Sequence, residues 1–380
     1  MLDVLVVGAG PAGSVAATVL ARAGARVRIV DRSTFPRDKL CGDTVNPGTL
    51  AALRRLGMAE GLERCGLPVA GMRLTGERGT VVEGRYPDGV RGRAILRRRL
   101  DWMLLQDAIA AGAQFEPALA VRRAIVGGGR VVGVEVNGGR TDAEVRARVT
   151  IAADGRRSTL AFGLGLASHP SKPRRWAMGA YLERGAAAPA ANDLGEMHVR
   201  AGCYIGIAPV PGGLTNVCLV QPWQPGQKAL EDPAAAILDA LSRDRQLRDR
   251  FAGARLAGPP IVLGPLAVDV RDGGIDGLLL AGDAAGFIDP MTGDGLRFAV
   301  RGAELAACAA AEALEHGWDG AHDRLRARRR AEFAGKWRFN RLVRSLVASP
   351  AAVAGASWGA RLSPSALRAA IEYAGDVRHA

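Results

Sequence analysis

Residues 2–33, LDVLVVGAGPAGSVAATVLARAGARVRIVDRS, constrain the fold of this chain more than any other stretch. They open with an apolar run over 2–7, which is typical of a strand buried in a parallel sheet. Three glycines follow at once in the spacing GxGxxG: Gly8, Gly10 and Gly13. A helix-compatible run and a second strand over 26–30 complete a β–α–β unit. This order predicts a doubly wound α/β domain whose first turn binds a phosphate.

The glycine spacing has a physical reason at each position. The first glycine permits a tight turn, the second lets the backbone approach a pyrophosphate, and the third lets the helix pack closely on the strand. Pro11 and Ala12 lie between them, where the helix begins and its unpaired N–H groups face the phosphates. Asp31 ends the second strand at the position where an acid accepts from a ribose hydroxyl, and Arg32 follows it. The stretch predicts a dinucleotide site without separating FAD from NAD.

Two later turns also join an apolar strand-like run to glycine and aspartate. They lie in TIAADGRRSTL and GLLLAGDAAGFIDPMTGDGLRFAV and contain the pairs Asp154-Gly155 and Gly282-Asp283. The second turn also holds Asp289 and Asp294, so a metal site was worth considering. These acids lack the 1-3-5 spacing and the terminal glutamate of a calcium loop. We therefore expect no metal.

Together, the three motifs resemble the flavin fingerprints of the FAD-dependent hydroxylase superfamily. The resemblance implies that Asp283 bonds the ribityl chain of FAD and that the following glycines let backbone approach the isoalloxazine ring. The residues it places at the edge of the flavin are Pro290, Gly293, Asp294 and Gly295. It also implies that Arg97, in ILRRRLDWMLLQDA, contacts FAD while Asp101 anchors its helix.

Further details are similar to one branch of that superfamily, the geranylgeranyl reductases. FPRDKLCGDTVNPGTLAALRRLG resembles their Cys-Gly stretch, which implies that Cys41 and Gly42 lie beside the flavin. Aromatic hydroxylases usually carry His after GDAA, whereas this chain has Gly286. The tryptophan-rich motif of the flavin halogenases is absent, and its place is taken by GCYIGIAPVPGG.

The whole chain reads as α/β: a Rossmann-like FAD-binding domain, an inserted antiparallel β-sheet substrate domain and a helical C-terminus. We predict a discontinuous FAD-binding domain over 1–70, 96–165 and 266–330. The substrate domain is predicted over 71–95 and 166–265, where short alternating strands are rich in aromatic and branched residues. Residues 331–380 are predicted to form a helical segment.

Four residues are candidates for the substrate pocket or for catalysis. Cys41 and Tyr204 are the catalytic candidates, and His198, Tyr204 and Pro209 are predicted to face the pocket. A free cysteine also serves as an ordinary packing residue, and a histidine on a strand is often a structural one. For Asp43, a role as general acid is weighed against a role as turn residue, and the turn is favoured.

Composition bounds the remaining possibilities. The 380 residues carry 51 Lys and Arg against 38 Asp and Glu, a net charge of +13 spread along the chain. The five cysteines are scattered without CxxC spacing, which favours a reducing, cytoplasmic setting. No apolar run is long enough to span a bilayer. The basic stretch over 322–347 interleaves Arg and Lys with apolar residues, so peripheral membrane contact is possible, and no nucleic-acid motif accompanies the charge.

The leading hypothesis is an FAD-dependent oxidoreductase that resembles geranylgeranyl reductases and acts on a small hydrophobic substrate: prenyl, alkyl-aromatic or polyketide-like. The alternative is a monooxygenase that hydroxylates or epoxidises an aromatic or polyketide-like substrate through a C4a-hydroperoxyflavin. A basic docking module with a structural flavin and a plain NAD-linked dehydrogenase are two further alternatives. No second GxGxxG follows, so NAD(P)H would bind transiently or a reduced carrier protein would supply the electrons. The sequence holds no signal for an oligomeric state.

Overall fold

The computed structural model describes residues 2–39, 42–76, 79–137, 142–171, 175–183, 193–222, 228–348 and 363–377, with Ala352, Gly355 and Gly359. Its first layer is a mainly parallel sheet in the order β20-β21-β11-β1-β2-β8. The strands are β1 (Leu2–Val7), β2 (Val27–Val30), β8 (Gln114–Glu116), β11 (Asp142–Ala152), β20 (Gly274–Ile275) and β21 (Leu278–Leu280). The apolar run at the N-terminus is therefore a central strand, paired in parallel with both β11 and β2.

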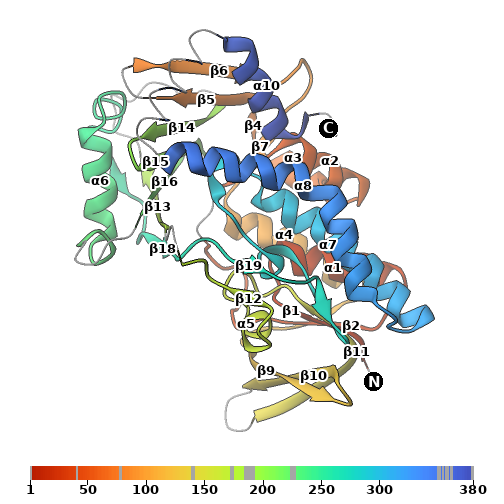
Figure 1. Ribbon diagram of the computed structural model, residues 1–380. Helices are drawn as coiled ribbons and strands as arrows, with labels where there is room; N and C mark the ends of the chain where they lie inside the picture. The colour runs from red at the N-terminus through yellow and green to blue at the C-terminus, as the bar shows by residue number, and fades with distance from the viewer. Residues whose placement is uncertain are drawn as a thin grey trace.

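Helices cover one face of this sheet (Figure 1). They are α1 (Pro11–Arg22), α4 (Arg97–Ala110), α7 (Gly295–His316) and α8 (Ala321–Ala348). Their apolar sides and the sheet share one large core, in which alanines allow α1, α4 and α7 to approach closely. The other face is covered by the meander of β9 (Ala120–Gly127) and β10 (Arg130–Asn137) and by α5 (Thr159–Gly163).

A second sheet stands above the carboxyl ends of the first, in the order β17-β13-β16-β15-β14-β5-β6, with β18 also paired to β13. Its strands are β5 (Gly71–Thr75), β6 (Val81–Arg85), β13 (Arg175–Glu183), β14 (Leu194–Arg200), β15 (Cys203–Pro209), β16 (Leu214–Pro222), β17 (Arg255–Leu256) and β18 (Ile261–Leu263). The β5–β14 pair is parallel, and the other pairs are antiparallel. The outer face packs against α6 (Pro233–Arg243).

Small elements join the two layers. The three-stranded sheet of β3 (Thr44–Val45), β7 (Gly92–Ala94) and β4 (Leu67–Val69) lies beside α2 (Pro47–Arg55) and α3 (Glu60–Cys65). β12 (Ala167–Ser168) pairs with β19 (Asp269–Val270). Short 3₁₀ turns occupy Lys228–Leu230, Gly282–Ala285 and Pro290–Thr292.

The C-terminal part is helical, as expected. α8 starts at Ala321 and runs through the predicted boundary at residue 330, and α10 (Pro364–Gly375) packs on β6 and β5 (Figure 1). None of the described helices combines the length and the apolar character that crossing a membrane requires. The predicted α/β fold with an inserted sheet and a helical C-terminus is confirmed.

Candidate functional site

The turn between β1 and α1 forms an open cradle of backbone groups. The N-cap of α1 is Gly10, and no side chain caps the helix, so its first N–H groups face outward. Gly8 has a φ of +101°, which side-chain-bearing residues rarely adopt. A Cβ on Gly13 would collide with the carbonyl oxygen of Gly8, so only glycine lets the helix lie this close to the turn. The cradle therefore has the shape and the positive dipole end that a pyrophosphate requires.

Asp31, at the end of β2, fixes the same turn. Its Oδ2 accepts from the Ala9 N–H at 2.8 Å and its Oδ1 accepts from the Ser33 N–H at 2.8 Å. The carboxylate is buried but still borders the cavity beside the exposed Arg32. Because each carboxylate oxygen has a second lone pair, Asp31 can shape the turn and also accept from a ligand hydroxyl.

The start of α4 supplies a buried arginine. Arg97 donates to both oxygens of Asp101, at 2.7 and 3.0 Å, and Arg37 lies 3.4 Å from the same carboxylate. The bidentate pair is almost wholly buried, which holds the Arg97 guanidinium rigidly at the edge of the cavity. The resemblance implied that Asp101 anchors its helix; in the structure its carboxylate pairs with Arg97, the first residue of that helix.

Asp154 lies in the loop between β11 and α5 and has an unsatisfied oxygen atom. Its Oδ2 accepts from the Thr159 N–H at 2.8 Å, whereas its buried Oδ1 has no hydrogen-bond partner among the described residues. Burial raises the pKa of this carboxyl, and the hydrogen bond from Ser158 opposes that rise. A buried oxygen without a donor is costly, so its place on the cavity wall fits a bound group that donates to it.

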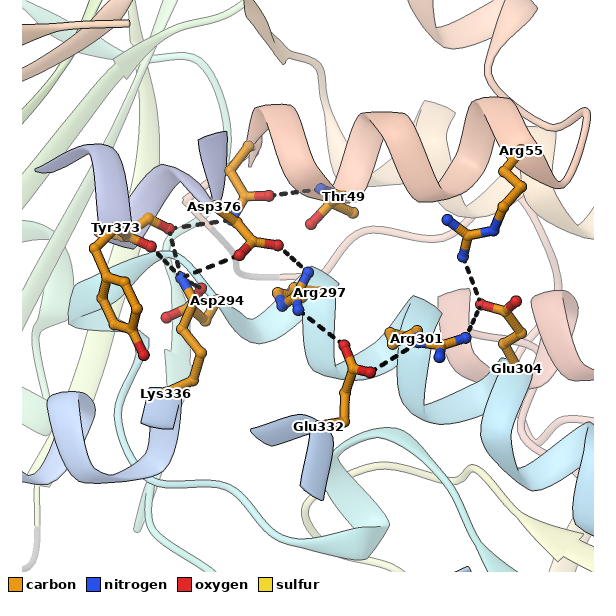
Figure 2. Close-up of polar contacts among 12 residues, drawn as sticks. Thr49, Arg55, Asp294, Arg297, Arg301, Glu304, Glu332, Lys336, Tyr373 and Asp376 are labelled. Carbon is orange, nitrogen blue, oxygen red and sulfur yellow. Dashed lines mark hydrogen bonds and ion pairs between the residues drawn. The ribbon is translucent and has the colours of Figure 1, made fainter. Parts of the chain in front are cut away.

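The loop after β21 packs against the start of α1, where a Cβ on Gly282 would meet the Ala12 side chain. Gly282 and Asp283 open the 3₁₀ turn over Gly282–Ala285, and a second turn over Pro290–Thr292 leads to α7. Asp294 is the N-cap of α7 but is 1% exposed and points away from the cavity, toward Lys336 of α8 at 3.1 Å. Figure 2 shows this pair beside Tyr373, at the end of α10.

One cavity of about 950 Å³ joins all these groups. Fifteen of the predicted cofactor residues line it: Gly8, Gly10, Pro11, Ala12, Asp31, Arg32, Gly42, Arg97, Asp154, Gly155, Gly282, Asp283, Pro290, Gly293 and Gly295. Gly13 and Asp294 lie behind the lining, and Cys41 lies outside the described residues. The size, the phosphate cradle and the unpartnered Asp154 oxygen together fit FAD, a long ligand held at several points.

The cavity continues past the flavin end between the second sheet and the C-terminal helices. This arm is lined largely by apolar side chains: Met72, Leu74, Val82, Tyr86, Ala177, Met197, Val199, Ala208, Cys218, Leu263, Leu266, Phe287, Met291, Phe339, Leu342, Val343, Leu346, Ala370, Ile371 and Ala374. The basic side chains of the lining come from the flavin end: Arg32, Arg37, Lys39, Arg97 and Arg157. The arm therefore suits a long hydrocarbon chain.

The predicted pocket residues occupy other places. His198 lies on the opposite face of β14, where its ring bonds Thr75 at 2.8 Å and Glu196 at 3.1 Å, so the expectation that it faces the substrate is wrong. Strand alternation gives Met197 and Val199 the cavity-facing positions instead. Although burial opposes it, hydrogen bonds from His198 and Arg250 lower the pKa of Glu196 to about 2.

Tyr204 lies on the cavity side of β15 but beneath the lining, 2% exposed. Its hydroxyl donates to Asp289 Oδ1 at 2.6 Å, and Asp289 lies 3.5 Å from the buried Arg175. Burial, followed by the Asp289 charge, raises the pKa of Tyr204 well above its ordinary value, which suits a structural hydrogen bond. Pro209 ends β15 next to the lining residue Ala208.

Two residues beside the cavity gain importance in the structure. Asp43, favoured as a turn residue, is 1% exposed and bonded to α4 and to β16. Lys39 lines the cavity, and burial, followed by repulsion from Arg97, lowers its pKa. The Asp43 carboxylate bonds Asn216, 173 positions away in the chain, a contact that no local pattern reveals. Within the described residues, no three His, Cys, Asp or Glu side chains are grouped to hold a metal ion.

Comparison with known proteins identifies relatives of this architecture. Residues 1–337 match the family described as FAD binding domain. The chain is 33% identical over 337 residues to digeranylgeranylglycerophospholipid reductase 2 of Methanopyrus kandleri, covering 82% of this chain and 78% of that protein. It is 33% identical over 327 residues to the menaquinone reductase of Mycolicibacterium smegmatis, covering 80% and 75% respectively.

Solved structures share the fold. The flavin-dependent brominase Bmp2 superposes with a TM-score of 0.83 at 20% identity, covering 98% of this chain and 93% of that one. At that identity the likeness describes the architecture: a flavin-binding layer beneath a second sheet.

Proposed function

Because the chain belongs to the FAD-binding family that spans residues 1–337, and within it to the geranylgeranyl reductase-like oxidoreductases, we propose that it is a reductase of a prenyl-bearing hydrophobic substrate. The observation that carries the proposal is the shape of the cavity. It runs without interruption from the FAD-fitting turns to an apolar arm between β5, β6, α8 and α10. A hydrocarbon chain in that arm would have its reacting end at the flavin.

The protein's own contribution is binding, orientation and exclusion of water. FAD supplies the redox chemistry when it is bound. The cradle at Gly10 would hold the phosphates, Arg97 is fixed by Asp101 at the cavity edge, and Asp154 has an oxygen that could accept from the bound group. Phe287, Leu296 and other apolar side chains around the turns make the reacting end of the cavity apolar, which disfavours water there.

The names of the relatives support reduction as the reaction. They are reductases of a prenyl lipid and of a prenyl quinone, and both align over about four fifths of this chain. The competing function, a monooxygenase of an aromatic or polyketide-like compound, keeps the same fold and cavity. The electron donor is proposed to be NAD(P)H or a reduced carrier protein.

We further propose that the mouth of the arm rests on a membrane surface. Leu342 and Leu346 of α8 line the cavity and are also 59% and 36% exposed. Arg341 on the same helix turn is exposed too, and the chain carries a net charge of +13. Apolar side chains beside basic ones are the pattern of a helix that lies on an anionic bilayer.

The deciding experiment supplies isotopically labelled O₂. Purified holoenzyme is given a reductant and a prenyl quinone or a geranylgeranyl lipid, with and without oxygen. A product that has lost a double bond or gained two hydrogens without oxygen supports the reductase. A product carrying labelled oxygen would establish the monooxygenase instead.

A further inference from the structure

Asp43 is held in an unusual conformation at the junction of the two domains. Its φ is +53°, in the left-handed region that disfavours residues with a Cβ, and its side chain is 1% exposed. Both of its neighbours, Gly42 and Thr44, line the cavity. Such backbone conformations persist only where surrounding contacts enforce them, and they cluster at functional sites.

Three donors from three elements hold the Asp43 carboxylate. The N–H of Arg97, the first residue of α4, donates to Oδ1 at 3.1 Å, and the amide of Asn216 on β16 donates to Oδ2. The hydroxyl of Tyr181 on β13 bonds the same carboxylate. Tyr181 and Asn216 are directly opposite each other in the β13–β16 ladder. The carboxylate therefore fastens the second sheet to the flavin-binding domain.

Asn216 connects the Asp43 carboxylate to the cavity wall. It is 3% exposed and lines the cavity among small or apolar neighbours, including Gly206, Ala208 and Cys218. The bond to Asp43 fixes one N–H of the amide and hence the orientation of the whole group. A buried amide held in one orientation within a largely apolar wall is a specific feature of this part of the cavity.

Resting on the proposed function, we propose that Asn216 hydrogen-bonds an uncharged oxygen of the substrate's head group, and that Asp43 is the positioning residue for that contact. The head group is then neutral, as in a prenylated quinone with a ring carbonyl. A phosphate here would face the buried Asp43 carboxylate. The Arg97 guanidinium, whose backbone N–H bonds Asp43, is already engaged in its bidentate pair with Asp101.

Binding titrations of the oxidised holoenzyme test the contact. Three probes are compared by the change that each causes in the flavin absorbance. They are a naphthoquinone with a short prenyl chain, a naphthalene with the same prenyl chain but no carbonyls, and geranylgeranyl phosphate. In Asn216→Leu, the quinone should bind about tenfold more weakly, since its oxygen loses a partner inside the cavity. The carbonyl-free probe should change by less than about twofold.

Asp43→Asn gives a readout that a purely structural role would not move. Burial raises the pKa of Asp43 to about 6, against the hydrogen bonds from Tyr181 and Asn216 and the charge of Arg97. The wild-type affinity for the quinone should therefore fall as the pH drops through about 6, and in Asp43→Asn it should not vary with pH. Asp244→Asn is the matched control, because Asp244 is also buried but pairs with Arg200 at 2.7 Å on the opposite face.

The outcomes separate this inference from the proposed function. Equal weakening of the quinone and the carbonyl-free probe in Asn216→Leu, or an unchanged pH profile in Asp43→Asn, would overturn the inference. Tighter binding of geranylgeranyl phosphate than of the quinone would also overturn it. If the wild-type holoenzyme keeps its FAD and binds none of the probes, the proposed function itself fails. Should Asp43→Asn not fold, Asn216→Leu still decides.

Discussion

Replacement of Lys336 by methionine should uncover a buried charge at the end of the flavin loop. The Lys336 side chain is 4% exposed, and its Nζ lies 3.1 Å from Asp294 Oδ1. It also donates to the carbonyls of Tyr373 and Ala374, the latter at 3.2 Å, and so closes the last turn of α10 (Figure 2). Methionine has a similar length and none of these hydrogen bonds.

The expected magnitude follows from burial. Asp294 is 1% exposed, and its Oδ2 already lacks a hydrogen-bond partner among the described residues. Removing one partner of a buried pair typically costs about 3–5 kcal/mol of unfolding free energy, because the other charge is left desolvated. An exposed pair is worth about 0–1 kcal/mol. Arg26→Met is the matched control, since the Arg26 side chain is 68% exposed in its pair with Asp3.

The loss should depend on pH in a defined direction. Burial raises the pKa of Asp294 above its ordinary value, and Lys336 opposes that rise. Without Lys336 the folded-state pKa rises further, so the folded protein binds this proton more tightly than the unfolded chain does. Stability then falls as pH rises from the unfolded pKa through the folded one. The Lys336→Met defect should therefore be larger at pH 8 than at pH 5, by linkage alone.

The assay is denaturant unfolding of holoenzyme at both pH values, followed by far-UV circular dichroism. Adding Asp294→Asn to Lys336→Met should recover part of the loss, because no uncompensated carboxylate remains. A loss below about 1 kcal/mol at both pH values, like that of an exposed pair, would refute the reasoning. So would a defect of equal size at pH 5 and pH 8.

Further variants examine the cofactor and the substrate arm. Asp283→Ala should purify without FAD, as shown by its absorbance spectrum; tightly held flavin would count against the assignment of Asp283. Gly13→Ala should lower both FAD content and thermal stability, since a Cβ there meets the Gly8 carbonyl; full occupancy would contradict the cradle. Ile371→Trp should block the arm, so that turnover of a long-chain prenyl quinone falls at least about tenfold while a short-chain one is reduced normally. Leu342→Ser combined with Leu346→Ser should reduce co-flotation with anionic vesicles; unchanged flotation would remove α8 from the proposed membrane contact.

Local patterns predicted the flavin end well. The turn over 8–13 needs glycine for reasons that act within a few residues, and the aspartates after β11 and β21 follow apolar strands whose ends meet at one sheet edge. For these segments, sequence order and strand parity suffice to place the side chains in a common cavity. The FAD-binding family and the α/β architecture could therefore be inferred before any coordinates were known.

The residues that surround the substrate were harder to predict from the sequence. Side chains alternate between the two faces of a strand, but which face borders the cavity is known only once the register of the strand is known. His198 was expected to face the substrate, yet the register of β14 against β5 and β15 turns it toward Glu196 and away from the cavity. Tyr204 faces the correct side but is covered by its neighbours. A shift of one residue in a strand reverses its faces, and nothing local in the sequence records that choice.

The sequence by itself indicated the cofactor. The Gly-rich turn between a buried strand and a helix predicts a dinucleotide, because that turn has few physical alternatives, and the two later Gly-Asp turns resemble the fingerprints of FAD. The tertiary structure alone decided what surrounds the substrate. Asp43 meets Asn216 across 173 positions of the chain, and Arg297 of α7 meets Asp376 across 79. Those contacts depend on how the two sheets pack against each other and on where the last helix docks. Docking is the sum of many weak contacts between distant segments, whereas a phosphate turn is specified by its own few residues.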